Sequence, residues 1–226
     1  AWHIPNRLEH GYSFGEHSLE RAAAEDARVV ISVDNGTSAH AVIAALKARG
    51  VDTIVTDHHE APPGPLPDAT AIVNPKLPGS RYPMRELCGG AVAFKLAWGL
   101  CQHLWGARRV SEEFKRFLEE ACAYVAIATV CDVVPLVDEN RVFARFGLKA
   151  LESTKNPGLA ALLEIAGLTG MRLAADDVGF QIGPRLNASG RLGSAERAVE
   201  LLLATDSTHA RRYALGLDEL NKKRKT

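Results

Sequence analysis

Three acidic positions in the sequence follow apolar segments and could bind a metal ion. The stretch VDTIVTDHHE (51–60) ends a β-branched run in Asp57, His58 and His59, and Asp34 ends the run ARVVISVD. Asp132 follows the apolar stretch AIATVC, where a carboxylate is costly to bury unless it is paired, caps a helix or binds a metal. Alone, Asp132 is better explained as a cap or a buried pair. Together, these carboxylates and imidazoles predict a site suited to Mn²⁺ or Zn²⁺.

The elements around Asp34 and the Asp-His-His run predict a strand, a helix and a second strand. The strands are expected at 27–36 and 51–59, and helical spacing of apolar residues predicts the helix at 38–50. Such a unit implies a parallel pair of strands with a right-handed crossover. Ligand sites in open parallel sheets lie beyond the carboxyl ends of the strands, so both motifs should meet at one edge.

The rest of the chain predicts an α/β fold, with a parallel sheet and flanking helices followed by a mostly helical part. The proline-rich stretch 61–69 excludes regular structure, and TAIVNPK (70–76) predicts another short strand. Aromatic residues such as Trp98 and Trp105 are expected in the core. Periodic apolar residues predict helices at about 88–105, 111–130, 142–153, 157–166, 174–182, 194–204 and 206–225.

A second group of residues could bind phosphate. The stretch GPRLNASGR (183–191) combines arginines, an amide, a hydroxyl and glycines ahead of a helix expected near Ser194, which suits a phosphate cradle. An ordinary capped loop with solvated arginines explains the same composition equally well. The segment HIPNR (3–7) is open to the same two interpretations. The candidates are Arg185, Asn187, Ser189, Gly190, Arg191 and Arg7.

Composition limits the classes of protein to which the chain can belong. Its 27 Lys and Arg balance 27 Asp and Glu, so a nucleic-acid partner would need a local basic surface. The four cysteines form no C-x-x-C pair and are expected to be reduced, buried thiols. No apolar run approaches the length of about 20 residues that a membrane span needs. We therefore expect a cytoplasmic protein without a membrane partner.

Five motifs, in this order and spacing, resemble the DHH phosphoesterase superfamily, and most closely its RecJ-type single-strand-specific exonucleases. HIPNRLEHGY and RLNASGR favour the RecJ type over the pyrophosphatases of the superfamily. The likeness runs from residue 3 to about residue 225. The motifs are SVDNG, VTDHHE, CGGAVAFKLA, ATVCDVVPL and GPRLNASGRLG.

The resemblance implies a phosphodiesterase that uses two metal ions, usually Mn²⁺ with Mg²⁺ as the alternative, and removes nucleotides from the 5′ end of single-stranded DNA. It implies Asp34, His58 and Asp132 as metal ligands, with Asp57 and His59 in supporting catalytic positions. The phosphate candidates would hold the substrate, with Arg7 near the 5′ end. DNA repair and recombination follow as the process, and a single-strand-binding protein and a recombination helicase as protein partners.

The chain also departs from the pattern of the superfamily. Its first motif, Asp-x-Asp, is absent, so one metal site is expected to be incomplete. The resemblance implies a partial DHH domain at 1–205, without its first strand unit, and the start of a connecting helix at 206–226. The C-terminal DHH-associated domain is absent too, so we expect this chain alone to be poorly active or inactive. The alternatives are a phosphodiesterase of oligoribonucleotides or cyclic dinucleotides, and a non-catalytic replication scaffold of the same superfamily.

Overall fold

A computed structural model of the chain describes residues 1–6, 9, 11, 14–191 and 195–225, without the side chains of Arg191 and Lys225. The chain forms two compact units. The first comprises Ala1–Pro5, Tyr12–Leu118 and Val134–Val142. The second comprises Asn6–Gly11, Glu119–Val133 and Phe143–Thr226.

The first unit is built on a parallel sheet of three strands in the order β1-β2-β3. These strands are β1 (Val29–Val33), β2 (Asp52–Thr56) and β3 (Ala71–Val73). In the register, Val33 lies opposite Thr56, and Thr56 lies opposite Val73, so the three strands end at one edge. The α/β fold class and the predicted strand, helix and strand are therefore confirmed, with shorter bounds than the sequence indicated.

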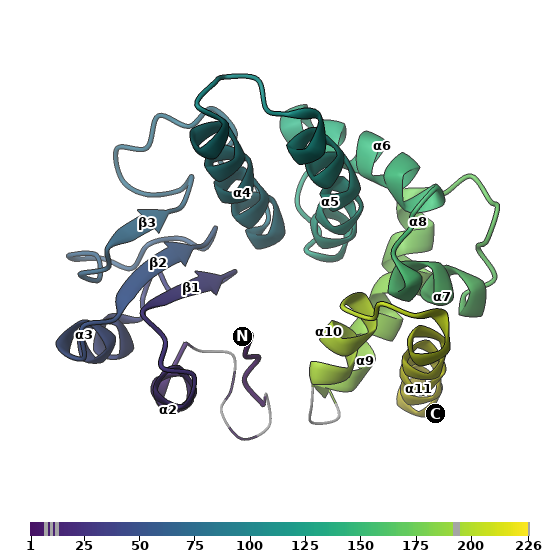
Figure 1. The fold of residues 1–226 in the computed structure, drawn as a ribbon, viewed down its shortest axis with the longest axis horizontal. Helices are drawn as coiled ribbons and strands as arrows, with labels where there is room; N and C mark the ends of the chain where they lie inside the picture. Colours follow the sequence, from purple (N-terminus) through teal and green to yellow (C-terminus); the bar gives the residue numbers. More distant parts are fainter. Residues whose placement is uncertain (7–8, 10, 12–13, 192–194, 226) are drawn as a thin grey trace. The chain divides into compact units, whose positions relative to one another are not determined.

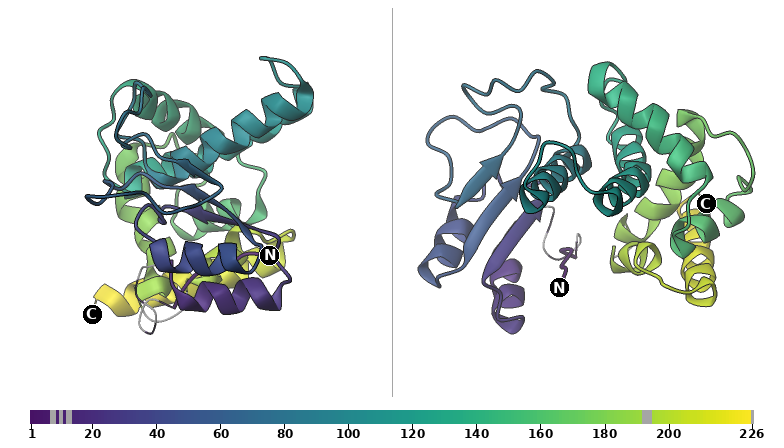
Figure 2. Two further views of the ribbon diagram at one scale, coloured as in Figure 1. Left: turned by 90° about the vertical axis from the view of Figure 1, so that its left-hand side faces the viewer. Right: turned by 45° about the horizontal axis from the view of Figure 1, so that its top comes forward.

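Helices cover both faces of this sheet (Figures 1 and 2). Helices α2 (Glu16–Ala24) and α3 (His40–Ala48) pack on one face, where Val55 of β2 joins a core with apolar residues of both helices. Helix α4 (Gly89–Trp105) contacts β1 and β2 from the other face. The alternation of side chains along a strand places Val55 and its neighbours in the strand on opposite faces.

The aromatic residues of α4 differ in burial. Phe94 is buried, as predicted, but Trp98 is 39% exposed and Trp105 is 56% exposed. The expectation that both tryptophans lie in the core is wrong for the structure of this unit. Phe94, Trp98 and Trp105 are four and eleven residues apart and lie along one side of α4, where the ring centroids of Phe94 and Trp98 are 6.2 Å apart. Helical period therefore does not separate the exposed tryptophans from the buried phenylalanine, and spacing alone cannot show which side chains the neighbouring elements cover.

The second unit is helical. Helices α5 (Glu112–Cys131) and α6 (Asp138–Glu152) contribute residues to both units. The second unit also contains a core of buried aliphatic side chains that includes Leu162, Ile182 and Leu217. Its remaining helices are α7 (Pro157–Ile165), α8 (Ala175–Asp177), the π-helix η1 (Val178–Ile182), α9 (Gly183–Arg191), α10 (Glu196–Leu202) and α11 (Ser207–Lys225).

The structure corrects the sequence prediction at GPRLNASGR. These residues form α9, which continues directly from η1, so they are not a loop that leads into a later helix. Because α9 continues from η1, Pro184 lies inside a continuous helical stretch, where its missing N–H removes one helical hydrogen bond, and the π-helical turn of η1 lies directly before it. Because backbone N–H groups inside a helix bond to the preceding turn, α9 does not offer the loop cradle of N–H groups that was one of the two interpretations of its composition.

The cysteines, possible membrane spans and the domain boundary were also predicted from the sequence. All four cysteines are free thiols, and Cys88 and Cys101 are buried, whereas Cys122 and Cys131 are partly exposed. Within the described residues, no helix is both long enough and apolar enough to cross a membrane. The predicted domain boundary at 205/206 stays a prediction, although α11 begins at Ser207, and so does the cytoplasmic location.

Candidate metal centre

Asp34 lies directly after β1, in a constrained backbone position. Its φ of 65° is in the left-handed region, which L-residues other than Asn, Asp and Gly adopt rarely. Its N–H donates a hydrogen bond to the carbonyl oxygen of Thr56, at 2.9 Å, which ties the end of β1 to the end of β2. Gly89, the first residue of α4, packs against the Asp34 side chain so closely that a Cβ would overlap it. The carboxylate is therefore held in place by its neighbours.

His58 and His59 meet Asp34 at this edge of the sheet. The Nε2 of His58, a buried residue, lies 3.0 Å from the Oδ1 of Asp34. The rings of His58 and His59 lie 4.5 Å apart between centroids. One ligand atom from each of Asp34, His58 and His59 can be chosen so that all lie within 4.8 Å of one another. The predicted meeting of Asp34 with the Asp-His-His run is thus confirmed, and the donors suit a divalent transition metal.

Asp57 is hydrogen-bonded to the residues that form this cluster. It is 2% exposed, and its Oδ2 accepts a hydrogen bond from the N–H of Thr37 at 2.9 Å. Its Oδ1 accepts from the N–H groups of His58 and His59 at 2.8 and 3.2 Å, and lies 2.7 Å from His59 Nδ1. These contacts engage both oxygens of Asp57 with the backbone of Thr37, His58 and His59 and with the His59 ring. The supporting catalytic role of Asp57 and His59 stays a prediction.

These hydrogen bonds determine how Asp57 titrates. Burial alone would raise its pKa, but the hydrogen bonds from Thr37 and His59 outweigh burial and lower the pKa of Asp57 to about 2. Because the pKa of Asp57 is lower in the folded chain than in the unfolded chain, where it is about 3.9, its ionisation stabilises the fold at pH values above 3.9. This stabilisation is lost as the pH falls toward 2.

We therefore expect Asp57→Asn to be about 2 kcal/mol less stable than the wild type at pH 5, with the difference shrinking toward pH 2. Urea denaturation at pH 5, 4, 3 and 2 measures this difference. A stability difference that stays constant from pH 5 to pH 2 would contradict the lowered pKa of Asp57. Asp68→Asn, at an exposed carboxylate that pairs with Lys47, is the control and should differ from the wild type in stability by less than about 1 kcal/mol.

Asn74 is a site residue that the sequence analysis missed. It follows β3, and its Nδ2 donates to the Oγ1 of Thr37 at 3.0 Å and to the carbonyl oxygen of His59 at 2.9 Å. Its Oδ1 accepts from the N–H of Lys76 at 2.8 Å. Asn74 thus joins the segments after all three strands. Its place directly after a predicted strand, at the same edge as Asp34 and Asp57, is the signal that could have identified it.

Asp132 belongs to the second unit, directly after α5. Its N–H donates to the carbonyl oxygen of Ala128, and Val133 then takes a φ of 58°, which ends the helix. Gly183, at the start of α9, packs against the Sγ of Cys131 with no room for a Cβ. The second unit therefore places the Asp132 segment beside the Gly-Pro-Arg segment, although about 50 residues separate them in the sequence. The role of Asp132 as a metal ligand stays a prediction.

The phosphate-binding candidates differ in their surroundings. Arg185 is largely committed within its unit: its Nε lies 2.9 Å from Asp218 Oδ1, and its Nη1 donates to the carbonyl oxygen of Gln181 at 2.8 Å. Asn187 is exposed, Ser189 is buried and Gly190 is partly exposed. Arg7 and the side chain of Arg191 lie outside the described residues. Substrate contact by any of these residues stays a prediction.

The fold and the site define a class of protein. Residues 2–129 match the model of the DHH family, N-terminal domain. This match covers both strand ends that carry Asp34 and the Asp-His-His run, together with α4. The chain therefore belongs to the DHH family.

Within this family, the chain is similar to single-stranded-DNA-specific exonucleases called RecJ. It is 42% identical to the protein of Dickeya dadantii over 98% of this chain and 41% identical to that of Bacillus subtilis over 99%. It spans 39% and 27% of the length of these relatives. A crystal structure of exonuclease RecJ bound to manganese matches with a TM-score of 0.84 at 34% identity, over 99% of this chain and 54% of that one. RecJ of Thermus thermophilus in complex with Mn²⁺ matches with a TM-score of 0.77 at 34% identity, over 92% and 30% of the two chains.

Proposed function

We propose that this chain carries the metal-binding part of a Mn²⁺-dependent exonuclease that hydrolyses single-stranded DNA from its 5′ end. The observation that carries the proposal is the approach of His58 Nε2 to Asp34 Oδ1 at the carboxyl edge of the parallel sheet. The names of the similar RecJ proteins supply the substrate, and the similar structures contain Mn²⁺ or Mg²⁺.

The residues fit such a metal in their chemistry. His58 offers an imidazole nitrogen and Asp34 a carboxylate oxygen, while Asp57 holds the backbone of His58 and the ring of His59. A pair of bound divalent ions supplies an activated water and neutralises the charge that develops on the phosphate oxygens. Asp34 and His58 would hold the metal, with Asp132 as a further carboxylate ligand. His59, with its side chain 62% exposed, is free to meet the substrate or solvent.

The remaining parts of the function rest on the resemblance to RecJ. Phosphate contacts from Arg7, Asn187 and Arg191 would position the strand without reading its sequence. For Arg185, we propose that Asp218 fixes the guanidinium while its Nη2 remains available to a phosphate. A single-strand-binding protein and a recombination helicase are proposed as partners, in DNA repair and recombination.

Titration calorimetry with Mn²⁺ tests the proposal directly. We expect the wild-type chain to bind Mn²⁺, and Asp34→Asn to weaken this binding by at least about a hundredfold, since loss of a supporting residue already costs about 10- to 100-fold. Asp68→Asn, which removes an exposed carboxylate outside the cluster, should bind like the wild type. If both variants bind alike, Asp34 is not a ligand, and the scaffold alternative is favoured instead.

A further inference from the structure

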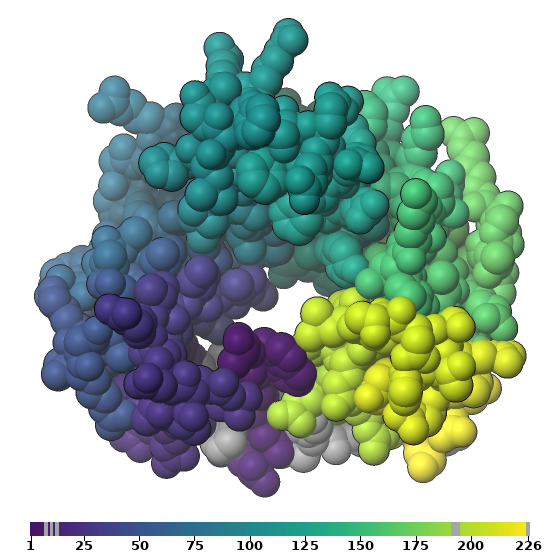
Figure 3. Space-filling view, in the orientation of Figure 1, coloured from purple at the N-terminus to yellow at the C-terminus, as the bar shows by residue number. Residues whose placement is uncertain are grey.

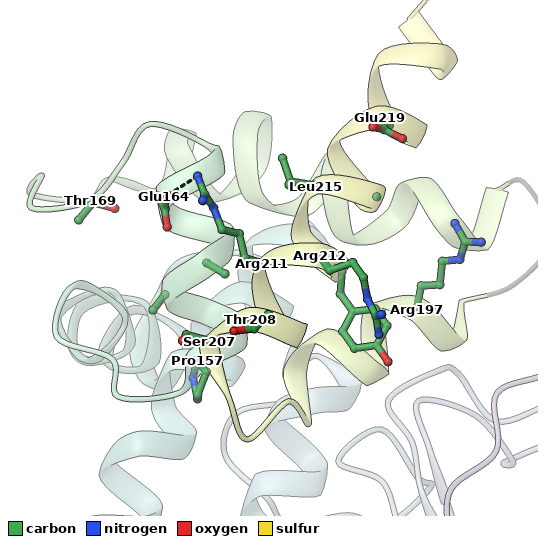
Figure 4. A pocket seen from close by; sticks show the side chains of 14 residues that line it. Pro157, Glu164, Thr169, Arg197, Ser207, Thr208, Arg211, Arg212, Leu215 and Glu219 are labelled. Atoms are coloured by element: carbon green, nitrogen blue, oxygen red, sulfur yellow. Dashed lines mark ion pairs between the residues drawn. The ribbon is translucent and has the colours of Figure 1, made fainter.

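A large groove crosses the surface of the second unit, and none of the residues that line it belongs to the proposed metal centre. It is bordered by residues of α7, α10 and α11 and has a volume of about 1190 Å³ (Figure 4). Helix α11, in yellow, lies at the surface in the space-filling view (Figure 3). Pockets for small molecules measure about 300–1,000 Å³, so this open groove is at least as large as a typical ligand pocket.

Three arginines line the groove. Arg211 is paired with Glu164, with Nη2 and Oε1 3.2 Å apart (Figure 4). Arg197 and Arg212 form no ion pair with any described residue, and both are exposed. Glu219 also lines the groove, likewise without an ion pair among the described residues. Two uncompensated guanidinium groups against one carboxylate give the groove a local positive charge, although the whole chain is neutral.

The groove also offers a planar surface. The guanidinium of Arg212 lies over the ring of Tyr213, with 5.4 Å between Cζ and the ring centroid. Proteins that bind single-stranded nucleic acid without sequence preference combine a basic groove with aromatic or arginine planes on which bases stack. The groove lining also includes the apolar residues Pro157, Ala160, Ala161 and Leu215, which can contact the faces of bases.

We propose that this groove is a second binding surface for single-stranded nucleic acid, with Arg197 and Arg212 on its phosphates and a base against the Arg212–Tyr213 pair. The occupant is a polyanion with exposed bases, which matches the charge and the planar surface of the groove. The inference rests on the proposed function only for the choice of DNA as the strand. Binding here needs neither the metal nor Asp34.

Fluorescence anisotropy with a labelled 20-nucleotide oligo-dT, in EDTA at low salt, tests the groove. We expect the double variant Arg197→Gln/Arg212→Gln to bind about tenfold more weakly. The slope of log affinity against log salt should be reduced by roughly 1.4, since each lost phosphate contact on a single strand removes about 0.7. Glu219→Gln removes the opposing charge and should bind two- to threefold more tightly.

Arg172→Gln is the matched control, because Arg172 is an exposed arginine of the same unit that lines a different hollow. It should leave both affinity and salt slope within error of the wild type. An equal effect of the control and the double variant, or no tightening by Glu219→Gln, would overturn the proposal. So would self-association that the double variant abolishes, because the groove would then hold a second copy. Failure of the metal centre would instead appear as lost Mn²⁺ binding with unchanged anisotropy in EDTA.

Discussion

Replacement of Gly89 by Ala is expected to weaken Mn²⁺ binding by roughly 10- to 100-fold, although residue 89 offers no ligand atom. A Cβ at this position would overlap the Oδ1, the Cγ and the Cβ of Asp34. The clash reaches the base of the side chain, so rotation of the carboxylate alone does not relieve it. Asp34 cannot move away freely either, because its left-handed backbone is tied to Thr56 by a hydrogen bond.

Titration calorimetry of Gly89→Ala measures this effect, and the same helix supplies the control. Gly99 also lies in α4, but a Cβ there would meet no atom within 4 Å. Gly99→Ala should therefore bind Mn²⁺ like the wild type and be more stable by about 0.5–1 kcal/mol, because Ala favours a helix. If both variants bind Mn²⁺ as the wild type does, the position of the Asp34 carboxylate does not determine metal affinity, and the proposed centre would need other ligands.

The sequence was sufficient to predict the sheet and the meeting of Asp34 with the Asp-His-His run. Both predictions depend on regular geometry: β-branched runs form strands, and the carboxyl ends of parallel strands share an edge. The register places Val33, Thr56 and Val73 side by side, and Asp34, Asp57 and Asn74 follow them. Asn74 was missed because an Asn before a proline reads as an ordinary turn residue, and its three hydrogen bonds exist only in the fold.

The prediction at residues 183–191 failed for a different physical reason. Local composition with Pro184 and Gly190 favours a turn, whereas the structure forms α9 there. The packing of Gly183 against Cys131 and the ion pair of Arg185 with Asp218 join α9 to α5 and α11. Tertiary contacts of this kind override weak local preferences, and a single sequence does not show them.

Glycines at helix contacts are a second case in which a single sequence does not show a tertiary contact. We expect the substitution of Gly147 to have the largest effect on stability. Gly147 lies in the middle of α6, where the sequence suggests only a weak helix position. In the structure, a Cβ at this position would overlap the carbonyl oxygen of Cys122 and the Cβ of Ala126, both in α5. Backbone atoms of a packed helix cannot rotate away, so the two helices must separate.

Gly147→Ala is expected to lower the free energy of unfolding of the second unit by at least about 2 kcal/mol, because overpacking costs more than the gain in helix propensity. Urea denaturation followed by circular dichroism measures the change. Gly216→Ala in α11 is the control, since a Cβ there meets no atom within 4 Å and should stabilise the helix by about 0.5–1 kcal/mol. Equal stability of the two variants would show that α5 and α6 do not cross closely at Gly147. A loss at Gly147 alone would show that close packing of α6 holds α5, the helix that leads into Asp132.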